Sequence, residues 1–346
     1  MSIENLHLLF EPQDIAGIPE AWQDNLEAAI ASFPGAKRLD FLCRDFILAA
    51  NDTLLLPQDA VEALFRAVGL IRRDEKLARL AWLWREIFLK KAESMPYPTQ
   101  WPSPIKAMGP DAALFSAVVL ISMLPPALEF HRQRGVSEDI SKASFRDFYI
   151  WLQDYYDKHG RWGLAGFTWL LLHLRGELYR LGRLQFCGAV FEEPVAEGFL
   201  PGLASIPQPG DPVLAVHIPA DGKLDHEQCR ASYLAALEFF PAYFPEIPFD
   251  AFTCHSWLLD PELRKILPES SNIVRFQRDF HIYSIQDDDR QMFERVFGNK
   301  PADLSQAPRD SSLRRAILDH LQAGNSMHKG MGFILRQEIE ALKSAP

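Results

Sequence analysis

The residues with the clearest chemical potential lie in the segment 213–228. Residues 213–216, together with Ile218, form an apolar run rich in β-branched side chains, which is typical of a strand buried on both faces. Pro219 and the Asp221-Gly222 pair then end this strand in a turn. His217 stands just before the turn, where a neutral imidazole, with an ordinary pKa of about 6.5, could act as a general base. A structural hydrogen bond is the other interpretation of His217.

A helix is expected to begin directly after this turn. Asp225, with Gln228 three residues later, resembles the capping box that starts many helices. The apolar residues that follow recur at helical spacing: Cys229, Tyr233, Leu237, Phe240 and Phe244. The first N–H groups of such a helix lack intrahelical partners and lie at the positive end of the helix dipole, so the segment predicts a phosphate or pyrophosphate site. An ordinary strand-turn-helix unit that binds no ligand is the alternative.

Residues 249–259 are predicted to form a second strand with polar side chains. By parity they divide into Thr253, His255 and Trp257 on one face and Cys254 and Ser256 on the other. Because successive side chains of a strand point to opposite faces, Cys254 and His255 cannot form a nucleophile-base pair. A hydrolase that depends on Cys254 would therefore need a base from elsewhere.

Residues 273–285 are predicted to form a third strand. One face of it is apolar, and the opposite face carries a polar row: Arg275, Gln277, Asp279, His281 and Tyr283. This row is either the solvated face of a sheet or the floor of a polar site. If this row lies inside a cleft, the interpretation as a polar site is favoured.

The composition argues against several classes of protein. The formal net charge of -10 disfavours general binding of nucleic acid or of an anionic membrane, because both need clustered Lys and Arg. The 4 cysteines lack Cys-x-x-Cys spacing, so reduced thiols and a cytoplasmic location are expected. No run approaches about 18 uninterrupted apolar residues, so membrane insertion is not expected. The histidines lack His-x-x-x-His spacing, so no metal site is expected.

The predicted elements change character along the chain. In the first part, apolar residues recur at three- and four-residue spacing between Pro and Gly breaks, which predicts helices. After Gly176 the period becomes strand-like, as in residues 178–187, and strands then alternate with helices. A chain of 346 residues is also long for one core. We therefore expect an α+β protein with an all-helical N-terminal domain, residues 1–135, and an α/β sandwich, residues 136–346.

Several phrases of the second half resemble those of a bacterial acyltransferase family. They are Phe148-Tyr-Ile-Trp-Leu-Gln-Asp-Tyr-Tyr156, His159-Gly-Arg-Trp-Gly-Leu164, Glu177-Leu-Tyr-Arg-Leu-Gly-Arg-Leu-Gln-Phe186, Val216-His-Ile-Pro219, His255-Ser-Trp-Leu-Leu259 and Asn272-Ile-Val-Arg-Phe-Gln-Arg-Asp-Phe280. That family joins a helical N-acyltransferase N-terminal domain to a GNAT-like C-terminal domain. The resemblance implies a GNAT-like sandwich with a mixed central sheet and an enzyme that uses acetyl-CoA or another acyl-CoA as co-substrate.

In that fold, a splayed strand presents backbone groups to the pantetheine of CoA, and the following turn and helix start hold the pyrophosphate. The resemblance thus implies cofactor-binding roles for Val216, His217, Ile218, Pro219, Gly222, Lys223 and Asp225. The usual pyrophosphate loop has the form Gln/Arg-x-x-Gly-x-Gly/Ala, whereas this turn holds a single glycine, Gly222. Lys223 could supply charge in place of additional backbone amides.

We expect direct transfer of an acyl group, such as acetyl, from a CoA thioester to an amine of a small molecule or peptide. This reaction needs a base and donors for the thioester oxyanion. The candidate bases are His217 and His255, with Asp279 as a carboxylate alternative. The candidate acceptor-binding residues are Trp257, Arg275 and Gln277. A noncatalytic GNAT-like ligand sensor or protein-interaction module is the alternative function, which the missing glycines favour.

Overall fold

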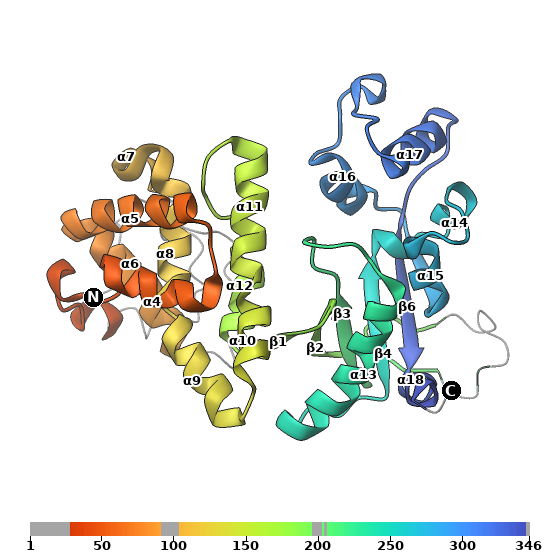
Figure 1. Ribbon diagram of the computed structural model, residues 1–346, viewed down its shortest axis with the longest axis horizontal. Helices are drawn as coiled ribbons and strands as arrows, with labels where there is room; N and C mark the ends of the chain where they lie inside the picture. The colour runs from red at the N-terminus through yellow and green to blue at the C-terminus, as the bar shows by residue number, and fades with distance from the viewer. Residues whose placement is uncertain (1–27, 91–103, 196–202, 204–205, 344–346) are drawn as a thin grey trace. The chain divides into compact units, whose positions relative to one another are not determined.

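The computed structural model describes residues 28–90, 104–195, 203 and 206–343 (Figure 1). The chain divides into two compact units, Met1–Tyr179 and Arg180–Pro346. The described elements of the chain up to residue 174 are helical, and the second unit is built on a sheet with helices. The expected α+β class is therefore confirmed.

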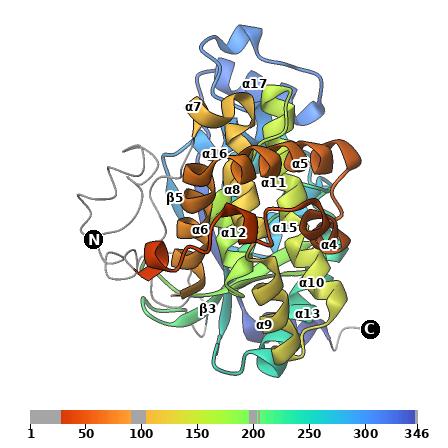
Figure 2. The ribbon, with the colours of Figure 1, turned by 90° about the vertical axis from the view of Figure 1, so that its left-hand side faces the viewer.

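The helical unit is made of amphipathic helices whose apolar faces meet in one core. The described helices are α4 (Arg44–Leu54), α5 (Gln58–Arg73), α6 (Glu75–Lys90), α7 (Ile105–Met108), α8 (Phe115–Ile121), α9 (Leu124–Arg134), α10 (Glu138–Phe145), α11 (Asp147–His159) and α12 (Phe167–Leu174), with 3-10 turns η2 (Ala36–Arg38) and η3 (Gly109–Leu114). Every residue of α8 is buried, and α5, α6 and α12 contact it (Figure 2). Helix α8 is therefore at the centre of this core.

The stretch Lys106–Arg134, which includes α8, is long and apolar enough to cross a membrane by length and composition, and its most apolar window has a mean hydropathy of 1.8. However, 67% of its most apolar window is buried inside the structure. The apolar character of this stretch is what the core of the helical unit requires.

The border between the two units falls at Tyr179, which is later than the expected border after residue 135. Helices α10, α11 and α12 follow residue 135 in the chain. They contribute to the helical core the buried side chains of Phe145, Phe148, Leu152, Leu170 and Leu171. Because these side chains complete a core that the earlier helices begin, the three helices belong to the first unit.

The second unit is built on a six-stranded sheet with the order β1-β2-β3-β4-β6-β5. The strands are β1 (Leu178–Leu181), β2 (Leu184–Val190), β3 (Pro212–His217), β4 (Ala251–Ser256), β5 (His281–Gln286) and β6 (Lys329–Leu335). Strands β3 and β4 run parallel, whereas β2 with β3, β4 with β6, and β5 with β6 are antiparallel. The expected mixed sheet is thus confirmed.

Helix α13 (His226–Tyr243) covers one face of this sheet through aromatic side chains. The ring centroid of Tyr233 on α13 lies 6.2 Å from that of Phe186 on β2 and 5.7 Å from that of Phe252 on β4. All three rings are completely buried, so α13 is tied firmly to the middle of the sheet. The remaining elements are η4 (Trp257–Leu259), α14 (Leu263–Ile266), α15 (Asn272–Arg278), α16 (Arg290–Phe297), η5 (Leu304–Gln306), α17 (Ser312–Gln322) and α18 (Arg336–Leu342).

Residues 178–187, predicted as one strand, are instead the hairpin of β1 and β2. Gly182 and Arg183 form its two-residue turn. Gly182 has a φ of 77°, a conformation that glycine adopts easily and that two-residue hairpin turns require. The glycine was the local signal for the turn, and the apparent alternation across it was misleading.

The strand predicted over residues 273–285 is wrong, because a helix occupies its first half. Ser271 caps α15 by accepting a hydrogen bond from the N–H of Val274 at 3.5 Å, and β5 starts only at His281. A helix of two turns can bury Val274 and Phe276 as well as a strand does, so alternation could not separate the two structures. The predicted polar row therefore does not lie on one face of a strand.

Strand β6 was not predicted, although it lies between β4 and β5 and pairs with both. Its sequence starts Lys-Gly-Met-Gly, and glycine is depleted in strands. A Cβ atom at Gly330 would overlap the backbone carbonyl of Leu259. The glycine is thus required where η4 lies against the strand.

His131 should make the stability of the helical unit depend on pH. Burial lowers the pKa of His131 from 6.5 to about 4, so the unfolded chain binds a proton in this range that the folded protein does not. We expect the free energy of unfolding to fall as the pH drops from about 6.5 to about 4, by up to about 3 kcal/mol. Urea unfolding at several pH values measures this loss. The variant His131→Asn should show a shallower pH dependence, and equal slopes in both proteins would contradict the assignment.

Candidate functional site

The two parallel strands of the sheet part before they end. The last pair of neighbouring residues between the two strands is Ala215 of β3 with Thr253 of β4. Beyond this pair, β3 continues to His217 and β4 continues to Ser256. Strand β2 stays paired with β3 up to its last residue. The gap therefore opens only between the carboxyl ends of β3 and β4, which is where ligands bind in sheets with parallel strands.

The turn from β3 to α13 starts at this gap, as the sequence predicted. Asp225 caps the helix by accepting a hydrogen bond from the N–H of Gln228 at 3.0 Å. Pro219 is buried, whereas Gly222 and Lys223 are exposed. Since the cap uses one amide only, the positive end of α13 and its other early N–H groups remain favourable for an anion.

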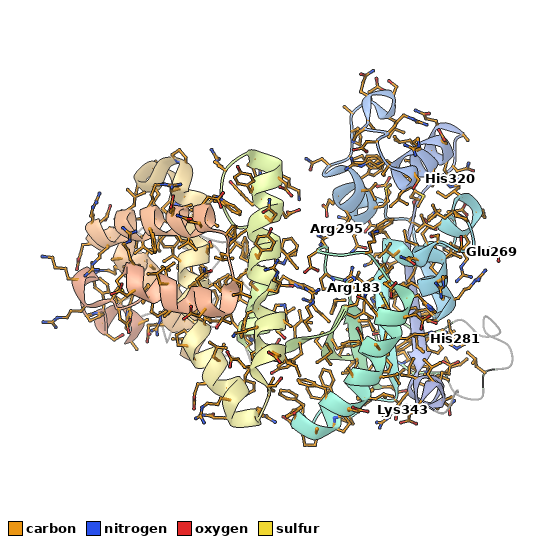
Figure 3. The ribbon with its side chains drawn as sticks, viewed as in Figure 1. Arg183, Glu269, His281, Arg295, His320 and Lys343 are labelled. Atoms are coloured by element: carbon orange, nitrogen blue, oxygen red, sulfur yellow. The ribbon has the colours of Figure 1, made fainter. Side chains whose placement is uncertain are left out.

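Arg183, in the hairpin turn between β1 and β2, is hydrogen-bonded to the backbone of the β3–α13 turn (Figure 3). Its Nε donates to the carbonyl of Lys223 at 2.7 Å. Its Nη2 donates to the carbonyls of Pro219, at 2.9 Å, and Gly222, at 2.8 Å. Only 6% of Arg183 is exposed, so this guanidinium fixes the turn from its buried side.

Arg180, on β1, binds the same turn through a side chain. It donates two hydrogen bonds to the carboxylate of Asp221, at 2.7 and 3.0 Å. Sequence analysis missed Arg180 and Arg183 because it treated both as residues of one strand. Their contacts join segments about 40 residues apart, for which a single sequence carries no local signal.

His217 and His255 project from the same face of the sheet. Val216 and Phe252 belong to the face that α13 covers, since Val216 pairs with Phe186, whose ring contacts that of Phe252. His217 and His255 have the opposite parity, so they project from the other face. There the Sγ of Cys187 lies 3.3 Å from Nε2 of His217. The structure thus brings the two candidate imidazoles to one face, at the ends of the parting strands.

The surroundings of His255 keep its imidazole neutral. Burial lowers the pKa of His255 below its ordinary value, and the charge of Lys329 lowers it further. The carboxylates of Glu192 and Glu193 act in the opposite direction but do not prevail. A neutral imidazole can accept a proton, so His255 is suited to act as a base at neutral pH.

Cys254 is poorly suited to act as a nucleophile. It lies on the α13 face, and burial raises the pKa of its thiol to about 12. A thiol with this pKa is protonated at neutral pH, whereas the thiolate is the reactive form. The geometry therefore disfavours the hydrolase that depends on Cys254.

Asp279 does not join the two imidazoles. Its carboxylate lies 2.9 Å from Nε2 of His226 and 3.1 Å from Nη2 of Arg230, both on α13. Since α13 covers the opposite face of the sheet, Asp279 is placed beside the start of that helix instead. Among the residues that the structure describes, no group of three or more His, Cys, Asp and Glu is placed to hold a metal ion.

Gln277 is completely buried and makes structural hydrogen bonds. Its Nε2 donates to the carbonyls of Leu258 and Asp260, at 2.7 and 2.9 Å. Its Oε1 accepts a hydrogen bond from Nε of Arg264 at 2.7 Å. These contacts join η4, α14 and α15, which differs from the acceptor-binding role expected for Gln277.

Trp257 and Arg275 make contacts within the second unit that differ from the acceptor-binding role expected for them. Trp257 is 7% exposed and packs in an apolar cluster with Leu263, Met292, Phe293, Val296, Ile317 and Met327. Arg275, on α15, forms an ion pair of 3.4 Å with Glu227 in the first turn of α13. Trp257 is therefore a core residue in this structure, and Arg275 lies near the start of α13.

Two family models match the chain in adjacent segments that do not overlap. The model of an N-acyltransferase N-terminal domain matches residues 45–176, and that of a GNAT-like C-terminal domain matches residues 178–334. The chain belongs to this two-domain acyltransferase family. The border between the matched segments agrees with the border between the two units of the structure.

Solved acyltransferase structures are similar to this acyltransferase over nearly its whole length. A mutant acyltransferase in complex with octanoyl-CoA is 26% identical, with a TM-score of 0.75. An acyltransferase in complex with decanoyl-CoA and teicoplanin is 25% identical, with a TM-score of 0.73, and one in complex with CoA and 10C-teicoplanin is 26% identical, with a TM-score of 0.75. Each comparison covers 97% of this chain and 99% of the other. No curated protein matched the chain.

The single glycine of the turn should be replaceable in this acyltransferase. Gly222 lacks a left-handed φ, and the nearest atom to an added Cβ would be Nε of Arg183 at 3.9 Å, an ordinary contact. We expect Gly222→Ala to change the free energy of unfolding by less than about 0.5 kcal/mol. Its Kd for CoA should also stay within about twofold of the wild-type value, a change of about 0.4 kcal/mol.

Gly330→Ala is the matched control, because its Cβ would overlap backbone atoms of Leu259. It should lower the free energy of unfolding by about 1–3 kcal/mol. Chemical unfolding and CoA titration of both variants measure the two effects. A large loss of CoA affinity in Gly222→Ala alone would contradict the view that this turn does not depend on its glycine.

Proposed function

We propose that this acyltransferase moves an acyl group directly from an acyl-CoA thioester to an amine of its acceptor. The observation that carries the proposal is the parting of β3 and β4 immediately before the turn that starts α13. In the proposed complex, the pantetheine runs along Val216 to Pro219. The pyrophosphate binds at Gly222, Lys223 and the start of α13, where backbone amides and the helix dipole favour an anion.

For the donor we propose a medium-length acyl group. The solved relatives hold octanoyl-CoA or decanoyl-CoA, which supports this length over acetyl. For the acceptor we propose an amine on a small molecule of the glycopeptide class, because two of the relatives are complexed with teicoplanin or 10C-teicoplanin. The rate of thiol release from acetyl-CoA, octanoyl-CoA and decanoyl-CoA, each measured with a panel of amines, tests both the proposed acyl length and the proposed acceptor class.

The transfer needs a proton acceptor and a site for negative charge. The amine attacks the thioester carbonyl only as a neutral nitrogen, and it loses a proton as the new C–N bond forms and the CoA thiolate leaves. We assign the proton to His217, with His255 on the neighbouring strand as the second candidate. Backbone N–H groups of residues 217 and 218 are the proposed donors to the oxyanion that develops during attack.

His217→Gln should lower kcat by about 100-fold or more, because glutamine can hydrogen-bond but cannot take up the proton at neutral pH. The Kd for octanoyl-CoA should stay within about twofold, since the donor is bound mainly by backbone groups and the turn. Steady-state kinetics and calorimetry measure the two quantities. Unchanged turnover would remove His217 from the mechanism.

His255→Gln in the same assay decides between the two imidazoles. If His255 is the base, His255→Gln should lose turnover and His217→Gln should keep it. The lowered pKa of His255 then predicts that the acidic limb of kcat/KM lies below pH 6.5, the ordinary value for this group. Full activity in both variants would exclude both imidazoles as the base.

Calorimetric titration with CoA tests the proposed pyrophosphate site. We expect micromolar affinity, on the order of -8 kcal/mol, and a loss of about tenfold in Lys223→Glu. Lys265→Glu is the matched control, because Lys265 is an exposed lysine of α14 that pairs with Glu262. Absence of binding up to millimolar CoA would overturn the acyl-CoA proposal. Binding without transfer to any amine would favour the noncatalytic sensor instead.

A further inference from the structure

We infer that Arg183 is a positioning residue for the pyrophosphate of the acyl donor. The inference rests on the proposed function, since it assigns a role within the CoA site. Arg183 sets the direction of the backbone N–H groups that meet the pyrophosphate, and it does so by binding the carbonyls of the same turn. In a glycine-rich loop, the freedom of the glycine backbone allows the conformation that binds phosphate. In this turn, hydrogen bonds from Arg183 hold the conformation instead.

The direction of the amides follows from peptide geometry. In a trans peptide the C=O of one residue and the N–H of the next point in opposite directions, and the described chain has no cis peptide bonds. Arg183 binds the carbonyls of Pro219, Gly222 and Lys223. The N–H groups of the residues that follow them, 220, 223 and 224, therefore point away from the guanidinium.

These three amides are available to a ligand. Within residues 206–343, none of the N–H groups of Ala220, Lys223 and Leu224 is hydrogen-bonded to the protein. They are separated from the start of α13 by one capping residue, Asp225. Backbone N–H groups that lack protein partners beside a helix N-terminus favour an anion such as a pyrophosphate.

The backbone of the hairpin turn that carries Arg183 is itself held in place by α13. The hydroxyl of Ser232 on α13 accepts hydrogen bonds from the N–H of Arg183, at 2.9 Å, and from that of Leu184, at 3.3 Å. The same hydroxyl donates to the carbonyl of Gln228 at 2.8 Å. The hairpin turn, the first turns of α13 and the β3–α13 turn are thus linked through one arginine and one serine.

The three contacts require the shape of arginine and not only its charge. The Nε and Nη2 of Arg183 lie on one edge of a planar fork and reach three carbonyls at once. A lysine would place a single compact ammonium there and could not reproduce this geometry. Comparison of Arg183→Lys with Arg183→Met therefore separates the effect of geometry from that of charge.

The test compares two donors that differ in the pyrophosphate. Calorimetry gives the Kd values of octanoyl-CoA and of S-octanoylpantetheine, which lacks the pyrophosphate and the nucleotide. Arg183→Met should raise the Kd of octanoyl-CoA by about tenfold or more. Arg183→Lys should produce most of the same loss. The Kd of S-octanoylpantetheine should change by less than about twofold in both variants.

Arg314→Met is the matched control. Arg314 on α17 also donates from Nε to a backbone carbonyl, that of Val296, at 2.9 Å, but it lies outside the turn. Its loss should leave both Kd values unchanged. Equal weakening of the two donors in the Arg183 variants would indicate a general structural defect and overturn the inference, as would full affinity for octanoyl-CoA in Arg183→Lys.

Hydrogen exchange provides a second readout that does not depend on the weaker donor. At equal saturation with octanoyl-CoA, residues 220–224 should gain protection in the wild type and in Arg314→Met but not in Arg183→Met. Protection of this segment in all three proteins would overturn the inference. If the wild type binds no octanoyl-CoA, the proposed function itself fails, which is a different outcome.

Discussion

The parallel pairing of β3 with β4 is the constraint on which the second unit depends. Parallel neighbours cannot be joined by a tight turn, so the chain must cross over one face of the sheet, and α13 makes this crossover. The helix therefore starts beyond the carboxyl end of β3, close to where the two strands part. Its early amides and the positive end of its dipole are thus placed beside the gap by topology alone.

The conformation of the turn depends on side chains instead. Glycine-rich loops reach unusual backbone conformations because glycine lacks a Cβ, but Gly222 has no left-handed φ to require this freedom. The charged fork of Arg183 binds three carbonyls of the turn, and hydrogen bonds to charged groups are the stronger kind in proteins. The site therefore depends on the β1–β2 hairpin, which lies 36 to 40 residues earlier in the chain.

The sequence was sufficient to predict those elements whose pattern lies within a few consecutive residues. The strand before the turn, the cap at Asp225 and the apolar stripe of α13 were predicted from such patterns and are confirmed. The prediction failed over residues 273–285, where strand and helix bury the same apolar side chains. It also failed at β6, where Gly330 is explained by its contact with η4, which is distant in sequence. It also missed Arg183, because the role of that side chain is set by carbonyls distant in sequence.

The sheet separates the two kinds of chemistry that the proposed reaction needs. The turn proposed to bind the pyrophosphate leads into α13, which covers one face, whereas His217 and His255 project from the other. A donor with its phosphates at one end and its thioester at the other can reach both only where β3 and β4 no longer pair. Fixing the pyrophosphate at the turn then also fixes how far the thioester extends past His217. In the proposed complex, the hydrogen bonds of Arg183 to the turn therefore help to set the geometry of attack, because small displacements of the reacting atoms strongly reduce the rate.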